Sequence, residues 1–167
     1  MSRKLELYVA AICVLSAAGL AALYRLDAAA DLRYWNAAAA FAFLGFVSFA
    51  FDYRRTRDLS GSSAFLPFLA TAALAPSWIS VVVVAITALV KEALARRTLL
   101  KGTFNVTQTA LAISIAILVY RALGGTSLLD DAQFRLIPYL GLFAAYLAVN
   151  SLAVSIAISL SQARSPR

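Results

Sequence analysis

Hydrophobic stretches and short charged connections alternate along this chain, and the charge of the connections alternates as well. Connections rich in Lys and Arg take turns with connections that are nearly neutral. Such a pattern is typical of a polytopic membrane protein, because positively charged loops stay on the cytoplasmic side of the bilayer. The sequence predicts six hydrophobic spans, at residues 7–24, 34–51, 59–75, 78–94, 104–123 and 136–160.

The distribution of Lys and Arg also orients these spans. Eleven of the 15 basic residues fall at the two ends of the chain, or in or next to the connections after the second and fourth spans. The other three connections and the span ends beside them hold only Arg25, Arg33, Arg121 and Arg135. The eight acidic residues divide evenly between the two sides, so the whole net charge of +7 lies on one side. We therefore predict that both termini face the cytoplasm.

The composition leaves few alternatives to a membrane protein. With 62% hydrophobic residues, a soluble fold would expose much of its apolar surface to water. We therefore expect an all-α integral membrane protein, and the short connections make residues 1–167 a single transmembrane domain. The basic residues form no continuous basic helix, so no nucleic-acid partner is expected.

Several kinds of chemistry are excluded by the residues that are missing. The chain has no histidine, and its single cysteine, Cys13, lies in the middle of the first span. This excludes His-based catalysis, haem ligation by His and an internal disulfide, and it leaves few ligand sets for a metal. We expect no metal, no cofactor and no enzymatic activity.

The third and fourth spans are short. Their uncharged parts, residues 64–75 and 78–90, are separated only by Pro76 and Ser77. The pair is compatible with two thin-membrane helices or with a re-entrant hairpin that enters from the cytoplasmic side. Short spans interrupted by Pro and Gly are found beside binding cavities in transporters, and also where a helix simply crosses a thinned bilayer.

Polar residues open the fifth span and define a candidate site. At 100° per residue, Asn105, Gln108, Thr109 and Tyr120 fall on one stripe of the helix. An unpaired amide in hydrocarbon is costly, so the stripe must face protein or a water-filled cavity. We expect a cluster, with Asn150 of the sixth span as a further candidate, that either forms hydrogen bonds between helices or lines a ligand pocket.

A row of small residues marks the sixth span. The row recurs at spacings of three and four and consists of Gly141, Ala144, Ala148, Ser151 and Ser155. Small side chains let two helix backbones approach closely, so the row predicts a helix-packing seam.

The cytoplasmic end of the fourth span carries a second candidate contact. Glu92 is followed four residues later by Arg96, which is the favourable order for an ion pair on a helix. We expect this pair to cap the helix at the membrane edge, because no second intramembrane carboxylate is present to complete a proton relay.

Residues 91–125 resemble a known family. The stretch reads KEALARRTLLKGTFNVTQTALAISIAILVYRALGG, and it is similar to the N-terminal membrane region of bacterial cyclic di-GMP signalling proteins with HD-GYP or GGDEF output domains. The similarity is carried by Glu92, Arg96-Arg97, Phe104-Asn105, Gln108, Tyr120 and Leu123-Gly124-Gly125. In outline that region is also similar to the S components of energy-coupling transporters.

The resemblance implies a non-catalytic module of the bacterial cytoplasmic (inner) membrane that senses a signal or anchors a partner. Its partners would be the lipid bilayer and either other membrane subunits or a cytoplasmic output domain absent from the chain. No cyclase or phosphodiesterase residue is present, so no enzymatic activity is implied. Two alternatives stay open: an accessory or scaffold subunit of a larger membrane complex, and a small-molecule-binding unit of a transporter.

Overall fold

The computed structural model describes residues 3–27, 32–50, 53–54, 60–61, 65–131 and 135–162. Its elements are α1 (Arg3–Leu26), α2 (Leu32–Ala50), β1 (Tyr53–Arg54), β2 (Ser60–Gly61), α3 (Phe65–Leu74), α4 (Trp78–Leu94), α5 (Leu99–Ala122) and α6 (Leu136–Gln162). The two strands form a single antiparallel pairing of two residues each. The described chain is otherwise built from six helices, so the predicted all-α class is confirmed.

The helix lengths qualify the prediction of six spans. Three helices, α1, α5 and α6, are long and apolar enough to cross a membrane. α3 has 10 residues, which cover about 15 Å, or about half of the hydrocarbon core. It is shorter than the predicted span of 59–75 because Ser60 and Gly61 belong to β2, while residues 62–64 lie outside the described part.

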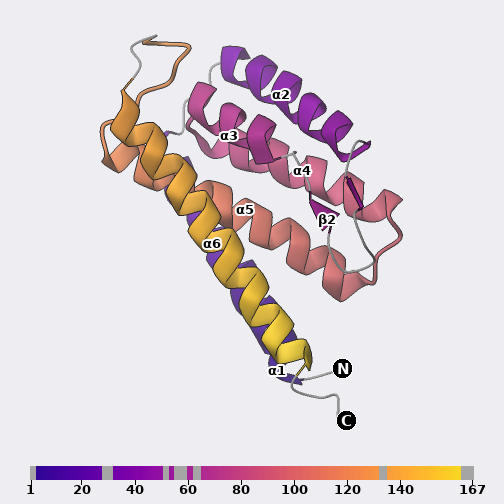
Figure 1. The fold of residues 1–167 in the computed structure, drawn as a ribbon. Helices are drawn as coiled ribbons and strands as arrows, with labels where there is room; N and C mark the ends of the chain where they lie inside the picture. Colours follow the sequence, from indigo (N-terminus) through magenta and orange to yellow (C-terminus); the bar gives the residue numbers. More distant parts are fainter. Residues whose placement is uncertain are drawn as a thin grey trace.

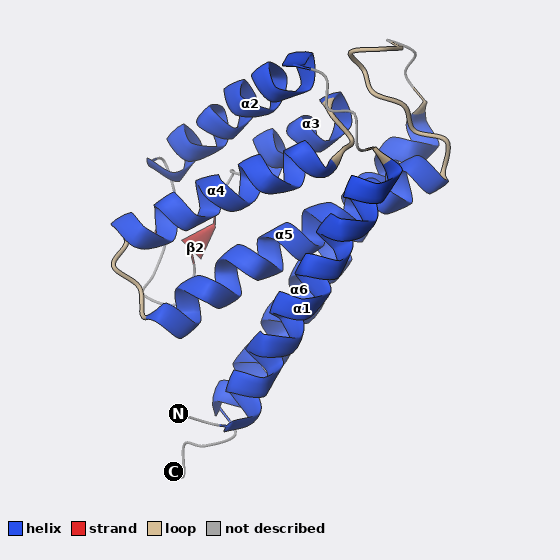
Figure 2. Ribbon diagram, turned by 180° about the vertical axis from the view of Figure 1, so that it is seen from behind, coloured by secondary structure: helices blue, strands red, loops and turns tan. Residues whose placement is uncertain are grey.

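α5 is the central helix of the bundle. It packs against α1 and α6 on one side and against α4 on the other, while α2 packs on α3 and α4 (Figure 1). α1 begins and α6 ends at the same end of the bundle, and the connection between α5 and α6 lies at the opposite end (Figure 2). The turn between α4 and α5 lies toward the end at which α1 begins (Figure 1).

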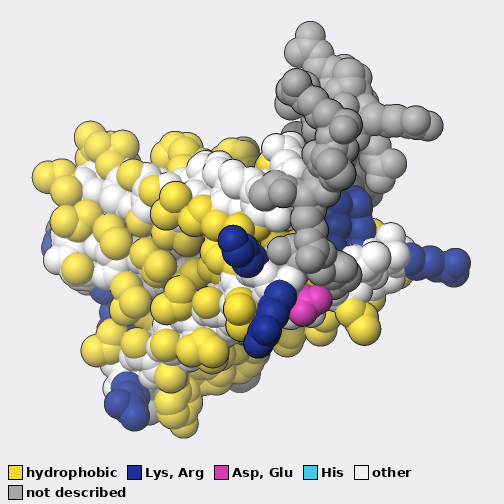
Figure 3. Space-filling view, turned by 90° about the horizontal axis from the view of Figure 1, so that it is seen from below, with side chains coloured by type: hydrophobic (Ala, Val, Ile, Leu, Met, Phe, Trp, Pro, Cys, Tyr) yellow, Lys and Arg dark blue, Asp and Glu magenta, His cyan; other side chains and the backbone are white. Residues whose placement is uncertain are grey.

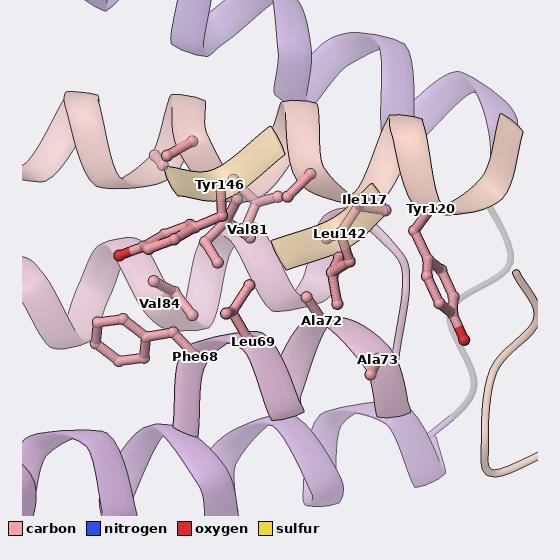
Figure 4. Packing of buried hydrophobic residues seen from close by; sticks show 14 of the residues in the cluster. Phe68, Leu69, Ala72, Ala73, Val81, Val84, Ile117, Tyr120, Leu142 and Tyr146 are labelled. Carbon is pink, nitrogen blue, oxygen red and sulfur yellow. The ribbon is translucent and has the colours of Figure 1, made fainter. Parts of the chain in front are cut away.

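The hydrophobic core lies around α5. Ala112, Ile113, Ala116 and Ile117 of this helix have no exposed surface, because neighbours cover most of its circumference. They pack with residues of the other helices, among them Phe68, Leu69, Val81, Val84, Leu142 and Tyr146 (Figure 4). A second, smaller cluster joins α1, α5 and α6, and it consists of Val9, Ile12, Phe104, Leu111 and Ala153.

Two buried serine residues lie where helices come close together: one between α1 and α5, and one in the turn between α3 and α4. Gly19 of α1 faces Ser114 of α5, and a Cβ at residue 19 would lie 2.9 Å from the Ser114 Cβ. The turn between α3 and α4 is closed by Ser80, whose buried hydroxyl donates to the carbonyl oxygens of Ala75 at 2.5 Å and Thr71 at 3.1 Å. Small hydroxyl side chains thus satisfy themselves on backbone oxygens inside the packed helices.

The outside of the bundle is apolar. Large side chains such as Leu7, Phe43 and Leu152 are more than 60% exposed. Figure 3 shows one face on which hydrophobic side chains cover most of the described surface. Exposure of this kind is unfavourable in water and neutral in hydrocarbon, so the exterior supports a membrane protein.

Candidate functional site

A pair of amide side chains joins α5 and α6 near the middle of both helices. Nε2 of Gln108 donates to Oδ1 of Asn150 at 2.6 Å. Gln108 is 4% exposed, and Asn150 is partly buried beside it. Because an unpaired amide at this depth is costly, the pairing holds the two helices at one mutual position. The structure therefore brings together two of the five residues in the predicted cluster.

The other three residues of that cluster lie apart from the pair. The Thr109 hydroxyl donates to the carbonyl oxygen of Asn105 in its own helix at 2.8 Å. The side chain of Asn105 is partly exposed and has no hydrogen-bond partner among the residues that the structure describes. Tyr120 lies three turns farther along α5, and its hydroxyl donates to the carbonyl oxygen of Thr126 at 2.8 Å. The stripe on α5 is thus divided between two separate sites.

α1 is tied to the region of the amide pair. The Tyr8 hydroxyl donates to the carbonyl oxygen of Ala153 on α6 at 3.0 Å. Cys13 Sγ lies 3.8 Å from Thr107 Oγ1 on α5, which itself donates to the carbonyl oxygen of Thr103. Polar contacts therefore link all three of the long apolar helices over a short length of each.

Glu92 and Arg96 do not form the predicted ion pair. α4 ends at Leu94, and Arg96 follows in the turn with a φ of 49°. Since the helix stops before Arg96, its side chain does not lie one turn above Glu92. Glu92 is 8% exposed, and its Oε2 has no hydrogen-bond partner within the described part of the chain.

The row of small residues on α6 is not an internal seam. Only Gly141 of the five lies against another helix, where Val119 of α5 and Leu123 just beyond it occupy the space that a Cβ would take. The other four residues are exposed: Ala144, Ala148, Ser151 and Ser155. The packed face of α6 carries larger side chains instead, with Pro138, Leu142 and Tyr146 buried. The row therefore points away from the bundle.

Charged residues form a network at the end of the bundle where α5 is joined to α6, and the sequence alone did not predict it. Arg33 lies 3.4 Å from Asp130, and the Tyr34 hydroxyl donates to the same carboxylate. Arg135 lies 3.9 Å from Asp131. Asp130 binds an arginine of α2, which the fold brings beside this connection, whereas Asp131 binds Arg135 four residues farther along the chain.

Arg121 of α5 extends this network to two further elements. Its guanidinium lies 3.7 Å from Asp27, at the end of α1, and donates to the carbonyl oxygen of Pro76 at 3.2 Å. Three arginines at this end are thus paired with three aspartates. The sequence does show opposite charges near the ends of successive spans, but the tertiary fold decides which arginine pairs with which aspartate.

Aromatic rings close the same end of the bundle. Trp78 of α4 stands between Tyr24 of α1 and Trp35 of α2, with ring centroids 5.6 Å apart in both pairs and the rings edge to face. Edge-to-face pairs at this distance are favourable. These residues fall at the ends of helices, as aromatic residues of a membrane–water interface do, and they also hold three helices together.

Most polar groups of these sites bind one another, and among the described residues the Asn105 side chain and Oε2 of Glu92 are exceptions. Within the described residues, no three His, Cys, Asp or Glu side chains are grouped so that they could hold a metal ion. The chemistry that the arrangement supports is hydrogen bonding and ion pairing between helices.

Breaking the amide pair should destabilise the packing of α6 on α5. Gln108→Leu or Asn150→Leu leaves one buried amide without its partner, and a double-mutant cycle should give a coupling energy of about 0.6–2 kcal/mol. Thermal unfolding in detergent measures it. Thr109→Val is the control, because the Thr109 hydroxyl binds its own helix; equal losses for all three variants would contradict a special role of the pair.

Comparisons with known proteins agree with a membrane module. The MASE9 family matches residues 31–166, which is more than half of the chain and includes α2 to α6. MASE domains are membrane-associated sensor domains. No curated protein and no solved structure matches the chain. On the strength of the family match, the chain belongs to the MASE9 family.

Proposed function

We propose that this protein is a non-catalytic membrane module that senses a signal. The observation that carries the proposal is membership of the MASE9 family. The resemblance of residues 91–125 to the membrane region of cyclic di-GMP signalling proteins favours the same function. In this proposal the module works without a cofactor, and it passes its signal to a cytoplasmic output domain or to another membrane subunit.

The proposal places the chain in the bacterial cytoplasmic membrane with six spans and both termini inside. An even number of crossings agrees with the position of the start of α1 and the end of α6 at one end of the bundle (Figure 2). The turn between α4 and α5, which lies toward that end, carries exposed Arg96 and Arg97. Lys101 is exposed in the first turn of α5. The arginines of the opposite end are largely neutralised by aspartates, so the positive charge favours the first end as the cytoplasmic one.

Thiol labelling tests this orientation. In a Cys13→Ala background, Thr126→Cys should react with an impermeant thiol reagent in intact cells, because Thr126 is exposed at the outer end. Thr98→Cys is equally exposed, in the turn between α4 and α5, and should react only after the membrane is made permeable. Reaction of Thr98→Cys from outside would overturn the orientation.

Sensing requires that a stimulus on one side change the structure on the other. In sealed right-side-out membrane vesicles, a membrane-permeant thiol reagent should label Thr98→Cys at a rate that changes several-fold when a stimulus is added on the outer side. A panel of pH, salt, redox potential and small metabolites supplies the stimuli, and an Asn150→Leu version, in which the amide pair is broken, should respond less. No response to any condition, together with a partner that copurifies under all of them, would favour a scaffold subunit.

One observation favours a second candidate function, the anchoring of another membrane protein. The small residues of α6 face outward, so a neighbouring helix is able to approach its backbone closely along this row. This function is compatible with sensing, since an anchored partner also receives the signal.

A bulky residue in the outward row tests anchoring. Ala148→Phe should leave the unfolding temperature of the isolated protein unchanged, because Ala148 is exposed and touches no internal seam. Copurification of a partner from native membranes should fall at least about tenfold, as expected when close backbone approach is blocked. Leu147→Phe, at an exposed position that is already large, is the control. Equal copurification of the partner with both variants would contradict anchoring and indicate that the row faces lipid.

A further inference from the structure

The connection between α5 and α6 is fastened to the end of α3. Ser127 is 5% exposed, and its hydroxyl donates to the carbonyl oxygen of Leu74 at 2.5 Å. The backbone N–H of Leu128 donates to the carbonyl oxygen of Ala73 at 3.4 Å. Carbonyl groups in the last turn of a helix have no partner within it. Residues 123–131, which we name the strap, therefore supply the cap that α3 lacks.

The strap is also fixed to both helices that it joins. The Tyr120 hydroxyl of α5 binds the carbonyl oxygen of Thr126, and the Tyr120 ring lies 5.4 Å from the ring of Tyr139 on α6. Gly141 sets the first turns of α6 directly against Leu123. A movement of the strap relative to α3 is therefore transmitted to the beginning of α6.

The outer surface of the strap is open to solvent. The Arg33 and Asp130 side chains are 63% and 43% exposed, and those of Arg135 and Asp131 are 51% and 38% exposed. Ion pairs this exposed are weak and are screened by salt or displaced by competing ions. The strap thus combines a buried attachment to α3 with an outer surface on which dissolved species act.

We propose that the strap is a conformational switch: its attachment to α3 sets the angle at which α6 leaves α5, so that conditions at the outer face control the position of the inner end of α6. The proposal rests on the proposed sensor function and names the device by which the module would respond. α6 extends about 30 Å beyond Gly141, at 1.5 Å per residue. A tilt of roughly 10° about that contact therefore moves its far end by about 5 Å.

Two neighbouring hydroxyl residues provide a matched pair of variants. Ser127→Ala removes the buried hydrogen bond to α3, whereas Thr126→Ala changes an exposed side chain of the same strap. Spin labels at Thr103→Cys on α5 and Ser161→Cys on α6, in a Cys13→Ala background in lipid nanodiscs, report the distance between the inner ends. Hydrogen exchange of the peptide that contains residues 123–131 reports detachment of the strap.

With Ser127→Ala we expect exchange in the strap to rise about tenfold, as for loss of a buried hydrogen bond, and the distance between the labels to shift by about 5 Å or to broaden by as much. Thr126→Ala should change neither. Faster exchange with an unchanged distance would overturn the coupling, and unchanged exchange would overturn the attachment. If Ser127→Ala fails to fold, Asp130→Asn, which removes an exposed ion pair of the strap, is measured instead; we expect smaller changes in the same two quantities, and no change in either would overturn the switch. This experiment adds no stimulus, so a negative result overturns the switch alone. The sensor function is tested separately, by the labelling of Thr98→Cys described above.

Discussion

The position of α5 determines most of the structure. Much of this helix is covered by neighbours, and the exterior of the bundle is apolar, so each buried polar group on α5 must find its partner within the protein. Ser114 meets this requirement on the backbone of its own helix, by donating to the carbonyl oxygen of Ala110 at 2.8 Å. Gln108 meets it by binding Asn150 of α6, and Tyr120 meets it by binding the backbone of the strap.

The short helix α3 depends on other elements in the same way. Its 10 residues leave a large share of backbone groups at helix ends, where partners within the helix are missing. Ser80 of α4 and Ser127 of the strap serve the carbonyl oxygens of its last turn, and Arg121 binds Pro76 just beyond it. A segment too short to be stable by itself is thus held by hydrogen bonds from three directions.

The sequence predicted the features that depend on local composition and periodicity. The all-α class and the six helices follow from the hydrophobic pattern, and the importance of Gln108 and Asn150 follows from the cost of amides in hydrocarbon. The predicted ion pair of Glu92 and Arg96 was wrong, because a pair at this spacing requires α4 to end at least two residues later than it does. Small residues allow close packing but do not require it, so the row did not indicate whether this face of α6 lies against the bundle or on its outside. The pairing of Arg33 with Asp130 joins residues almost one hundred positions apart, and only the fold decides such a choice.

α1 precedes the residues that match the family, yet it is packed into the body of the protein. The match starts at residue 31, whereas Gly19 lies against Ser114 and Tyr8 binds the backbone of Ala153. The matched region and the packed body of the protein therefore differ by one helix. A chain cut at the start of the match would uncover the side of α5 on which α1 packs. The part of the chain that the family model covers is therefore smaller than the unit that packs together.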